Sequence, residues 1–310
     1  MTDSRKPIVI VGSITMDLVT RTPRIPAIGQ TLIGTGFETT PGGKGANQAV
    51  AASRLGYPVA MVAKIGDDAY GPALIENLKR AGVETAAMSQ APGSSGLAPI
   101  FVADDGSNAI VVVPGANGKM DRAAVDKHAE LIRSAGMVLC QLEIPMDTLS
   151  YTLDLCAQAG VPVMLDPAPA AALPDAVWGN VAWFTPNETE AAFYVGDGIS
   201  VEDSADRLLA KGLRGVALKR GADGAYVAVA GGRADWVKPF KVAAIDTVAA
   251  GDCFNGAFAV ALLEGPDPCH DPWAAARFAN AAAAICVTRK GAAASMPSRA
   301  EVDAFLRANA

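Results

Sequence analysis

Short apolar runs alternate along the chain with segments in which apolar residues recur every three or four positions. The runs predict buried strands, because a strand covered on both faces has few polar positions; they are Ile8–Val11, Val59–Ala63, Met137–Gln141, Val161–Leu165, Val181–Phe184 and Gly215–Leu218. The periodic segments predict the helices Lys44–Leu55, Gly71–Ala81, Arg122–Arg133, Met146–Ala159, Asp203–Lys211, Pro272–Thr288 and Ser298–Leu306. This alternation predicts an α/β fold with a mostly parallel sheet between two helical layers.

Two segments interrupt the alternation, at about 14–42 and 95–115. Both lack a helical pattern and contain turn residues with brief alternating pieces, namely Thr31–Ile33, Phe37–Thr39, Ala98–Ala103 and Ala109–Val113. We expect them to form one small sheet apart from the main body, serving as a lid over a site. An ordinary pair of hairpins at a sheet edge is the alternative. With these insertions, residues 1–310 form a single predicted domain.

The composition is that of a globular protein with a substantial core, since 51% of its 310 residues are hydrophobic. A net charge of −6 and a sequence pI near 5.0 argue against a nucleic-acid partner, which requires a concentrated basic surface. No apolar run approaches the length of a membrane span, and the amino terminus lacks a leader pattern. We therefore expect a cytoplasmic protein without a membrane partner.

Cysteine and histidine usage narrows the possible chemistry. The five cysteines have no C-x-x-C spacing, so buried free thiols are expected in place of disulfides or a zinc site; they are Cys140, Cys156, Cys253, Cys269 and Cys286. The only histidines, His128 and His270, lie in polar surroundings and are too few for a histidine-based triad or metal cluster. Acid–base work therefore falls to carboxylates or lysine.

The most informative stretch is 242–258, which reads VAAIDTVAAGDCFNGAF. Three small residues, Ala249, Ala250 and Gly251, precede an apolar pattern typical of a helix with one buried face. Small residues leave the unpaired N–H groups of a helix start uncovered, and these groups favour an anion such as phosphate. Asp252 in the first turn is then a candidate base beside that anion, although aspartate is also a common helix cap.

A second glycine-rich motif, GGKGAN at 42–47, lacks the spacing of a Walker phosphate loop. Its glycines allow a close approach to the backbone, and Asn47 lies about one turn into the following helix. We interpret it as a site for a polyol, with a plain strand-to-helix turn as the alternative.

Polar residues also follow the predicted strands, where ligands bind in folds of this type. They are Thr15, Asp17, Gln141, Glu143, Asp166, Asn187, Glu190, Lys219, Gly221 and Gly224. Many acceptors and few cations indicate a neutral, hydroxyl-rich ligand and a metal-bound phosphate. Any one of these residues alone could be a loop cap.

Five segments together resemble the ribokinase family of carbohydrate kinases: GSITMDL, PGGKGANQAVAASRLG, TPNETEA, DTVAAGDCFNGAF and AAAAICVTRKGAAASMP. The resemblance covers essentially the whole chain. It implies a three-layer α/β core, a small β-sheet lid that also makes a homodimer contact, and ATP-dependent phosphorylation of a sugar hydroxymethyl group. For D-ribose, this is the 5-hydroxyl, and the products are ribose 5-phosphate and ADP.

The resemblance also implies roles for individual residues. Asp252 would take the proton from the sugar hydroxyl, while the amides of Ala249, Ala250, Gly251 and Asp252 hold the γ-phosphate. Sugar hydroxyls would bind Thr15, Asp17, Gly42, Gly43, Lys44, Asn47 and Glu143. The nucleotide would be bordered by Asn187, Lys219, Arg220, Gly221, Ala222, Asp223, Gly224 and Asn280. Glu190, with Asn187, would order Mg²⁺, and a K⁺ site would use Asp246, Val248, Cys286, Arg289, Gly291 and Ser295.

One position departs from the family pattern. Members that act on ribose usually carry Asn at the position of Thr15, and Thr is shorter and lacks the two amide donors. Three hypotheses follow: a kinase of ribose, a kinase of another sugar such as deoxyribose or of a nucleoside, and a sugar-binding regulator without turnover. The intact Asp252, Asn187 and Glu190 favour the enzymes, because a sensor does not need them.

Overall fold

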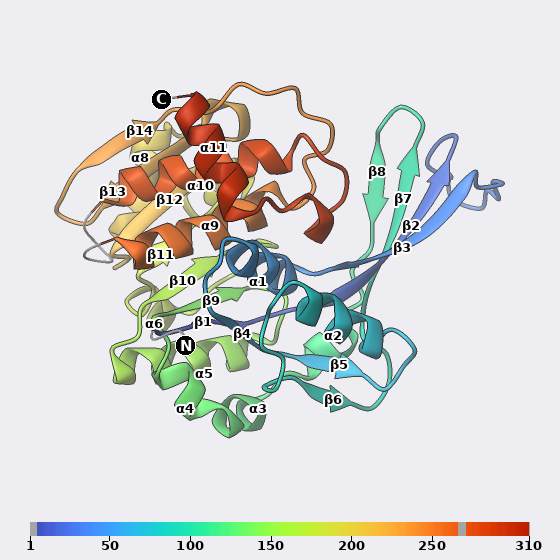
Figure 1. Cartoon of the computed structure of the whole chain (residues 1–310), viewed down its shortest axis with the longest axis horizontal. Helices are drawn as coiled ribbons and strands as arrows, with labels where there is room; N and C mark the ends of the chain where they lie inside the picture. Colours follow the sequence, from blue (N-terminus) through green and yellow to red (C-terminus); the bar gives the residue numbers. More distant parts are fainter. Residues whose placement is uncertain (1–4, 266–270, 310) are drawn as a thin grey trace.

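The computed structural model describes residues 5–265 and 271–309, and its centre is an eight-stranded sheet (Figure 1). In spatial order the strands are β14 (Ala234–Val237), β13 (Ala225–Val229), β12 (Gly215–Lys219), β11 (Trp183–Phe184), β10 (Val163–Asp166), β9 (Met137–Gln141), β1 (Ile8–Val11) and β4 (Val59–Val62). All neighbours from β12 to β4 pair in parallel, as predicted. The sequence did not reveal β13 and β14, which extend one edge in antiparallel pairing.

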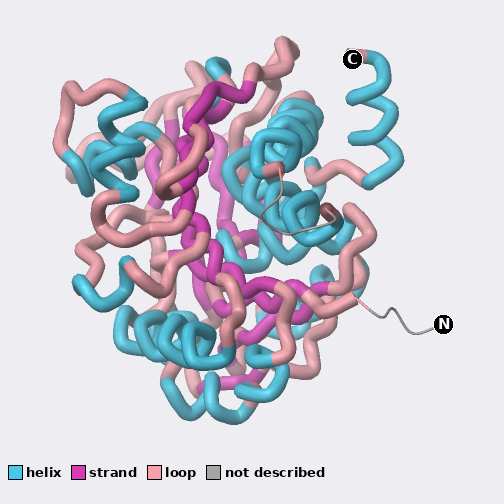
Figure 2. Tube along the Cα trace, turned by 90° about the vertical axis from the view of Figure 1, so that its left-hand side faces the viewer, coloured by secondary structure: helices cyan, strands magenta, loops and turns pink. Residues whose placement is uncertain are grey.

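Helices cover both faces of this sheet, which Figure 2 shows between two helical layers. The reason is visible in β1, where Ile8 and Ile10 belong to one buried cluster and Val9 and Val11 to the other. The first cluster includes residues of α1 (Lys44–Arg54), α2 (Gly71–Arg80), α9 (Ala250–Glu264), α10 (Pro272–Cys286) and α11 (Arg299–Ala308). The second includes residues of α3 (Arg122–Lys127), α4 (Ala129–Arg133), α5 (Met146–Ala159), α6 (Asp175–Trp178), α7 (Glu188–Val195) and α8 (Val201–Leu209).

The expected small sheet is present and projects from one side of the main body (Figure 1). Its order is β3 (Gly36–Gly42), β2 (Thr15–Thr22), β7 (Gly96–Ala103) and β8 (Asn108–Ile110). Thr31–Ile33 was wrongly expected to be part of a strand; it lies in a loop, where Ile33 is largely exposed. The strand expected over Ala109–Val113 ends at Ile110. Beyond it, the Val111 N–H donates to the Pro99 carbonyl, and Val113 forms a bridge with Leu97.

Some helix boundaries differ from the predictions for local reasons. The single helix expected over 122–133 is broken at His128 into α3 and α4. The start of α8 lies two residues earlier than expected, because the Ser200 side chain caps it by accepting from the Asp203 N–H. A two-stranded parallel sheet, β5 (Lys64–Gly66) with β6 (Ser89–Ala91), was not predicted, nor were α6 and α7.

Four of the five cysteines are buried free thiols, while Cys269 and His270 lie outside the described residues. Within the described part of the chain, no helix has both the length and the apolar character needed to cross a membrane.

Candidate active site

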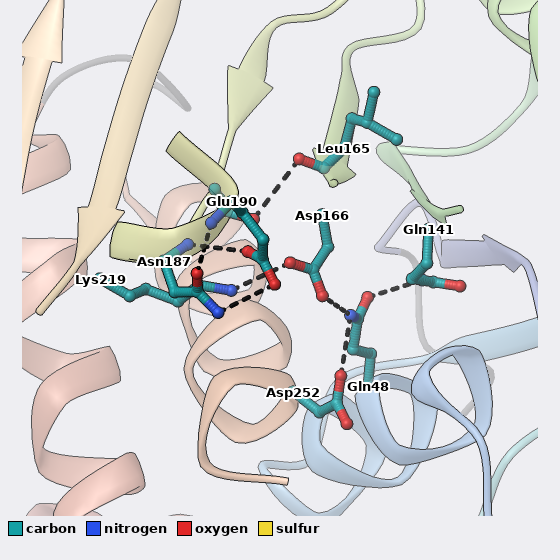
Figure 3. Close-up of polar contacts among 9 residues, drawn as sticks. Gln48, Gln141, Leu165, Asp166, Asn187, Glu190, Lys219 and Asp252 are labelled. Carbon is teal, nitrogen blue, oxygen red and sulfur yellow. Dashed lines mark hydrogen bonds and ion pairs between the residues drawn. The ribbon is translucent and has the colours of Figure 1, made fainter. Parts of the chain in front are cut away.

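The carboxyl ends of the parallel strands bring polar side chains together at one edge of the sheet (Figure 3). Asp166 at the end of β10 forms an ion pair with Lys219 at the end of β12, with 3.0 Å between Oδ1 and Nζ. Gln141 at the end of β9 donates to Oε1 of Gln48 on α1 at 2.7 Å. The predicted meeting of residues that follow separate strands is therefore observed at these positions.

Asp252 lies at the centre of this network, in the first turn of α9, and its side chain is buried. Asn47 donates to its Oδ2 at 3.0 Å, and Gln48 donates to its Oδ1 at 3.1 Å. Burial raises the pKa of the carboxyl to about 6, with Lys44 acting in the opposite direction and Asp166 adding to the increase. Asp252 is thus held by neutral donors in one orientation, with a pKa suited to accepting a proton near neutral pH.

The helix start beside Asp252 is suited to an anion. Ala249 has φ 60° and ψ 12°, a left-handed conformation that no other non-glycine residue adopts in the described part of the chain. The Ala250 N–H donates to the Thr247 carbonyl at 3.3 Å. Over the described ranges, the N–H groups of Ala249, Gly251 and Asp252 have no protein acceptor. All three residues line one cavity, and the helix dipole favours an anion there.

A second group of polar side chains lies around Asp17 on β2. Thr15 donates its hydroxyl hydrogen to Asp17 Oδ1 at 3.1 Å, and Gly42 lies against the same carboxylate, since a Cβ there would come within 2.5 Å of Oδ2. Burial raises the pKa of Asp17 to about 6; the hydrogen bond from Thr15 opposes this shift, and Glu143 contributes to it. Glu143 in turn accepts from the Lys44 N–H at 3.3 Å.

The glycines of the 42–47 motif have a structural reason that the sequence did not reveal. A Cβ on Gly43 would lie 2.7 Å from the Thr15 nitrogen, and one on Gly45 would lie 2.7 Å from the Ser13 nitrogen. The backbone that approaches them is therefore the chain's own β1–β2 connection, which places Thr15 and Asp17 beside the start of α1.

Lys44, the first residue of α1, stands among acidic groups. Burial lowers its pKa, but Asp252, Asp166, Glu143 and Glu190 outweigh burial and hold the pKa above its usual range. Lys44 therefore stays charged and links the Asp17 group electrostatically to Asp252.

A cavity of about 950 Å³ extends from Lys44 and Asp252 to Asn280 on α10. Lys219, Gly221, Ala222 and Gly224 line it, as does an apolar set that sequence reasoning missed: Pro239, Phe240, Val242, Ala244, Ala283, Ala284 and Val287. Asn280 donates to the carbonyls of Val237 and Lys238, each at 3.2 Å. Arg220 and Asp223 are not among the lining residues; the Arg220 side chain forms ion pairs with Glu188 and Asp223.

Asn187 and Glu190 form a reciprocal cap at the start of α7, on the wall of the cavity. The Glu190 N–H donates to Asn187 Oδ1 at 2.8 Å, while Glu190 Oε2 accepts from the Asn187 N–H at 2.8 Å. Burial raises the pKa of Glu190, an effect that Lys219 opposes and Asp166 reinforces. The fixed Glu190 carboxylate adds hard oxygen donors to the cavity.

The residues assigned to a monovalent cation also meet, around the loop before α9. The Asp246 carboxylate accepts from the Val248 N–H at 3.0 Å and from the Gly291 N–H at 2.9 Å. Cys286 Sγ and Ser295 Oγ lie 3.0 Å apart. The Arg289 N–H donates to the Cys286 carbonyl, and the Arg289 side chain turns away to pair with Glu301. Among the described residues no cluster of three or more His, Cys, Asp or Glu side chains suits a metal ion.

Comparison with known proteins identifies the family. The model of the pfkB family carbohydrate kinases matches residues 5–299. The chain belongs to the pfkB family of carbohydrate kinases. This confirms the family and the kind of activity that the sequence motifs predicted.

Individual members of the family extend the comparison. The ribokinase of Bacillus subtilis is 42% identical to this chain over 96% of it and 99% of that protein. The deoxyribokinase of Salmonella typhi is 35% identical to this chain over 97% of it and 99% of that protein. The solved structure of Arabidopsis thaliana ribokinase complexed with ribose and ATP has a TM-score of 0.91 and 33% identity, covering 98% of this chain and 99% of that chain.

Sequence reasoning assigned no role to Gln48, which is 1% exposed and hydrogen-bonded to Asp252, Asp166 and Gln141. The available signal was a polar side chain directly before the apolar run Ala49–Ala52, next to Asn47, the other buried polar residue of this helix. Asp166 was noted only as one polar residue after a strand, whereas it forms the ion pair with Lys219.

Proposed function

We propose that this kinase transfers the γ-phosphoryl group of ATP to the 5-hydroxyl of D-ribose, giving ribose 5-phosphate and ADP. The observation that carries the proposal is the position of Asp252, a buried carboxylate that accepts from Asn47 and lies in the first turn of a helix with free N–H groups. Support comes from 42% identity to the Bacillus subtilis ribokinase and from the likeness to a ribokinase complexed with ribose and ATP.

Asp252 is the proposed base. It receives the proton of the attacking hydroxyl, while the amides of Ala249, Gly251 and Asp252, with that of Ala250 as a weaker member, stabilise charge on the transferring phosphoryl group. A loose phosphoryl-transfer transition state requires removal of the proton only late, so positioning and charge neutralisation contribute most. Holding Asp252 with two neutral amides serves that positioning.

The sugar is proposed to bind among Asp17, Gly42, Gly43, Lys44, Asn47 and Glu143, with Thr15 beside Asp17. Carboxylates accept hydrogen bonds from hydroxyl groups, and the side chains of Lys44 and Asn47 donate. The alternation of donors and acceptors suits a polyol better than an ion. One end of this group reaches Asp252 through Asn47, where the 5-hydroxyl would react.

ATP is proposed to occupy the 950 Å³ cavity, with its base toward the apolar residues near Asn280 and its phosphates toward Gly251. Asn187, Lys219, Gly221, Ala222 and Gly224 would border it. The oxygen donors of Glu190 and Asn187 fit Mg²⁺, which binds few carboxylates and keeps several waters. When bound, the ion would neutralise charge on the triphosphate.

A monovalent cation, normally K⁺, is proposed to bind beside the loop that leads into α9. Asp246 supplies a carboxylate, and backbone or hydroxyl oxygens of Val248, Cys286, Arg289, Gly291 and Ser295 would complete the oxygen set. The donor chemistry fits, because Ser295 is fully buried and Asp246 bridges two segments of this loop region. The ion would stabilise the left-handed turn at Ala249.

A homodimer through the small sheet is proposed from the apolar side chains that this sheet and its adjoining loops expose. Ile33, Phe37 and Ile110 are 86%, 66% and 53% exposed, and Val111 and Val112 continue the patch. An apolar surface of this kind on a projecting sheet marks a protein contact. A second subunit covering it would also fix the lid that Thr15 and Asp17 belong to.

One observation favours 2-deoxyribose as a second candidate substrate. The Thr15 side chain has one donor, its hydroxyl, and this already donates to Asp17. Thr15 therefore has no donor left for a sugar hydroxyl. A site with one less polar partner for the 2-hydroxyl discriminates less against a sugar that lacks it. The 35% identity to a deoxyribokinase is consistent with this candidate.

A coupled ADP-release assay with Mg-ATP tests the proposal. The panel contains ribose, 2-deoxyribose, a hexose and a nucleoside, each with K⁺ and with Na⁺. We expect ribose to give the highest kcat/KM and K⁺ to increase it. A higher value for another sugar would reassign the substrate within the family, and the absence of turnover with every acceptor would overturn the proposal.

A further inference from the structure

Lys219 and Asp166 form an ion pair that is nearly removed from solvent. Their side chains are 12% and 4% exposed, and 3.0 Å separates Nζ from Oδ1. Burying two charges costs desolvation free energy that their mutual attraction often fails to return. Stability of the fold alone therefore does not explain this pair, which lies on the wall of the cavity and not in an apolar core.

The ammonium group of Lys219 lies beside the helix start at Gly251. A Cβ built on Gly251 would be 3.4 Å from Lys219 Nζ and 4.0 Å from its Cε. Figure 3 shows Lys219 reaching toward Asp166, between Glu190 and the turn that carries Asp252. The ammonium and the free N–H groups of Gly251 and Asp252 thus border the same part of the cavity.

The ammonium group of Lys219 has donor capacity that its ion pair does not use. Asp166 accepts one of the three hydrogens of the ammonium group, so an anion in the cavity can accept another without breaking the ion pair. The backbone of Lys219 is fixed, because its N–H donates to the Pro186 carbonyl at 2.8 Å. A cation held in this way is pre-organised for charge that develops near Gly251.

We propose that Lys219 is a catalytic residue whose ammonium group contacts the transferring γ-phosphoryl group, and that Asp166 is the positioning residue that holds it there. This role differs from the one that the sequence motif implied for Lys219, which was to border the adenosine. It rests on the proposed function in one respect, namely that the cavity binds ATP with its terminal phosphate at Gly251. Asp166 in turn is held by Gln48, whose Nε2 donates to its Oδ2 at 3.0 Å.

The test measures binding and turnover separately. Lys219→Met removes the charge at nearly constant length, and dissociation constants for AMP, ADP and ATP with Mg²⁺ are measured by calorimetry alongside kcat for ribose. We expect AMP affinity to stay within about threefold, ATP affinity to fall at least about tenfold, and kcat to fall about 100-fold or more, the usual effect of removing one transition-state donor. Retained AMP binding shows that the variant is folded.

Two further variants sharpen the result. Asp166→Asn should lower kcat without weakening ATP binding, because the ammonium is then misplaced but no longer shared with a carboxylate. Lys79→Met, which changes an exposed lysine at the end of α2, is the matched control and should change nothing.

The outcomes distinguish this role from the proposed function. A Lys219→Met variant that loses affinity equally for AMP, ADP and ATP, or that keeps the wild-type kcat, would overturn the role of Lys219. If Lys219→Met selectively loses ATP affinity but the unmodified protein does not phosphorylate ribose, the contact of Lys219 with the γ-phosphate is upheld. In that case, ribose is not the substrate.

Discussion

Gln48 on α1 donates one hydrogen bond to Asp252 Oδ1 at 3.1 Å, and the same nitrogen donates to Asp166 Oδ2 at 3.0 Å. One neutral amide therefore orients the proposed base and the partner of Lys219 together. Removing it with Gln48→Met should lower kcat by about 10- to 100-fold, because small misplacements of reacting groups are costly.

A pH profile separates this effect from a loss of stability. The hydrogen bond from Gln48 lowers the pKa of Asp252, so the acidic limb of kcat/KM should move to higher pH in Gln48→Met. The matched control is Gln158→Met, which changes an exposed glutamine on α5. An unchanged acidic limb together with an unchanged kcat would refute the positioning role.

The pH dependence of the unmodified enzyme follows from two raised pKa values. Burial places the pKa values of Asp252 and Asp17 at about 6, above the usual value near 4. Each carboxyl must be ionised, Asp252 to take a proton and Asp17 to accept sugar hydroxyls. We therefore expect kcat/KM to rise with pH through about 6, with a slope on logarithmic axes that exceeds 1 below this point, and to level off above pH 7. A limb centred near pH 4 would contradict the account.

The sequence predicted the residues that lie in motifs and in strand ends, but not those whose role depends on packing between distant elements. Asp252 and Asp17 follow from local patterns, because a helix start and the chain segment that follows a buried strand are local features. Gln48 reads as an ordinary helix residue until α1 packs against α9, where a Cβ on Gly256 would come 2.8 Å from the Gln48 carbonyl oxygen. The position of Lys219 near Gly251 likewise depends on tertiary structure.

Elements of the fold differ in the same way. The buried parallel strands were predictable, because both of their faces are apolar. The edge strand β14 was not predictable, because its first three residues are exposed and it has no apolar run. Its pairing with β13 becomes visible only in the structure. The loop at Thr31–Ile33 misled the prediction because alternation alone does not supply a neighbouring strand.

Thr15 offers a test of sugar discrimination. In Thr15→Asn, the amide supplies two donors in place of the hydroxyl that bonds to Asp17. We expect the ratio of kcat/KM for ribose over 2-deoxyribose to increase at least about tenfold, because the added donors can bind a hydroxyl that only ribose carries. Thr20→Asn, an exchange further along β2, is the control. Equal ratios in wild type and Thr15→Asn would rule out a role in discrimination.

Asp246 tests the proposed cation site. Its carboxylate joins Val248 to Gly291, and Asp246→Asn retains the size of the side chain while removing the charge. We expect the rate increase by K⁺ over Na⁺ to disappear and kcat to become independent of the choice of cation. Asp223→Asn removes an exposed carboxylate outside the cavity lining and is the control for loss of charge alone. It should retain K⁺ activation. Persistent K⁺ activation in Asp246→Asn would place the cation elsewhere.

The central claim is that Asp252 accepts the proton of the sugar hydroxyl, and Asp252→Asn tests it most directly. The measurement is single-turnover phosphorylation of ribose by the variant, with Mg-ADP affinity measured on the same preparation. Because the change leaves the backbone N–H groups of the helix start in place, we predict a rate lower by about 10³-fold or more with ADP affinity within about threefold of wild type. A rate within about tenfold of wild type would contradict the role of Asp252 and, with it, the proposed mechanism.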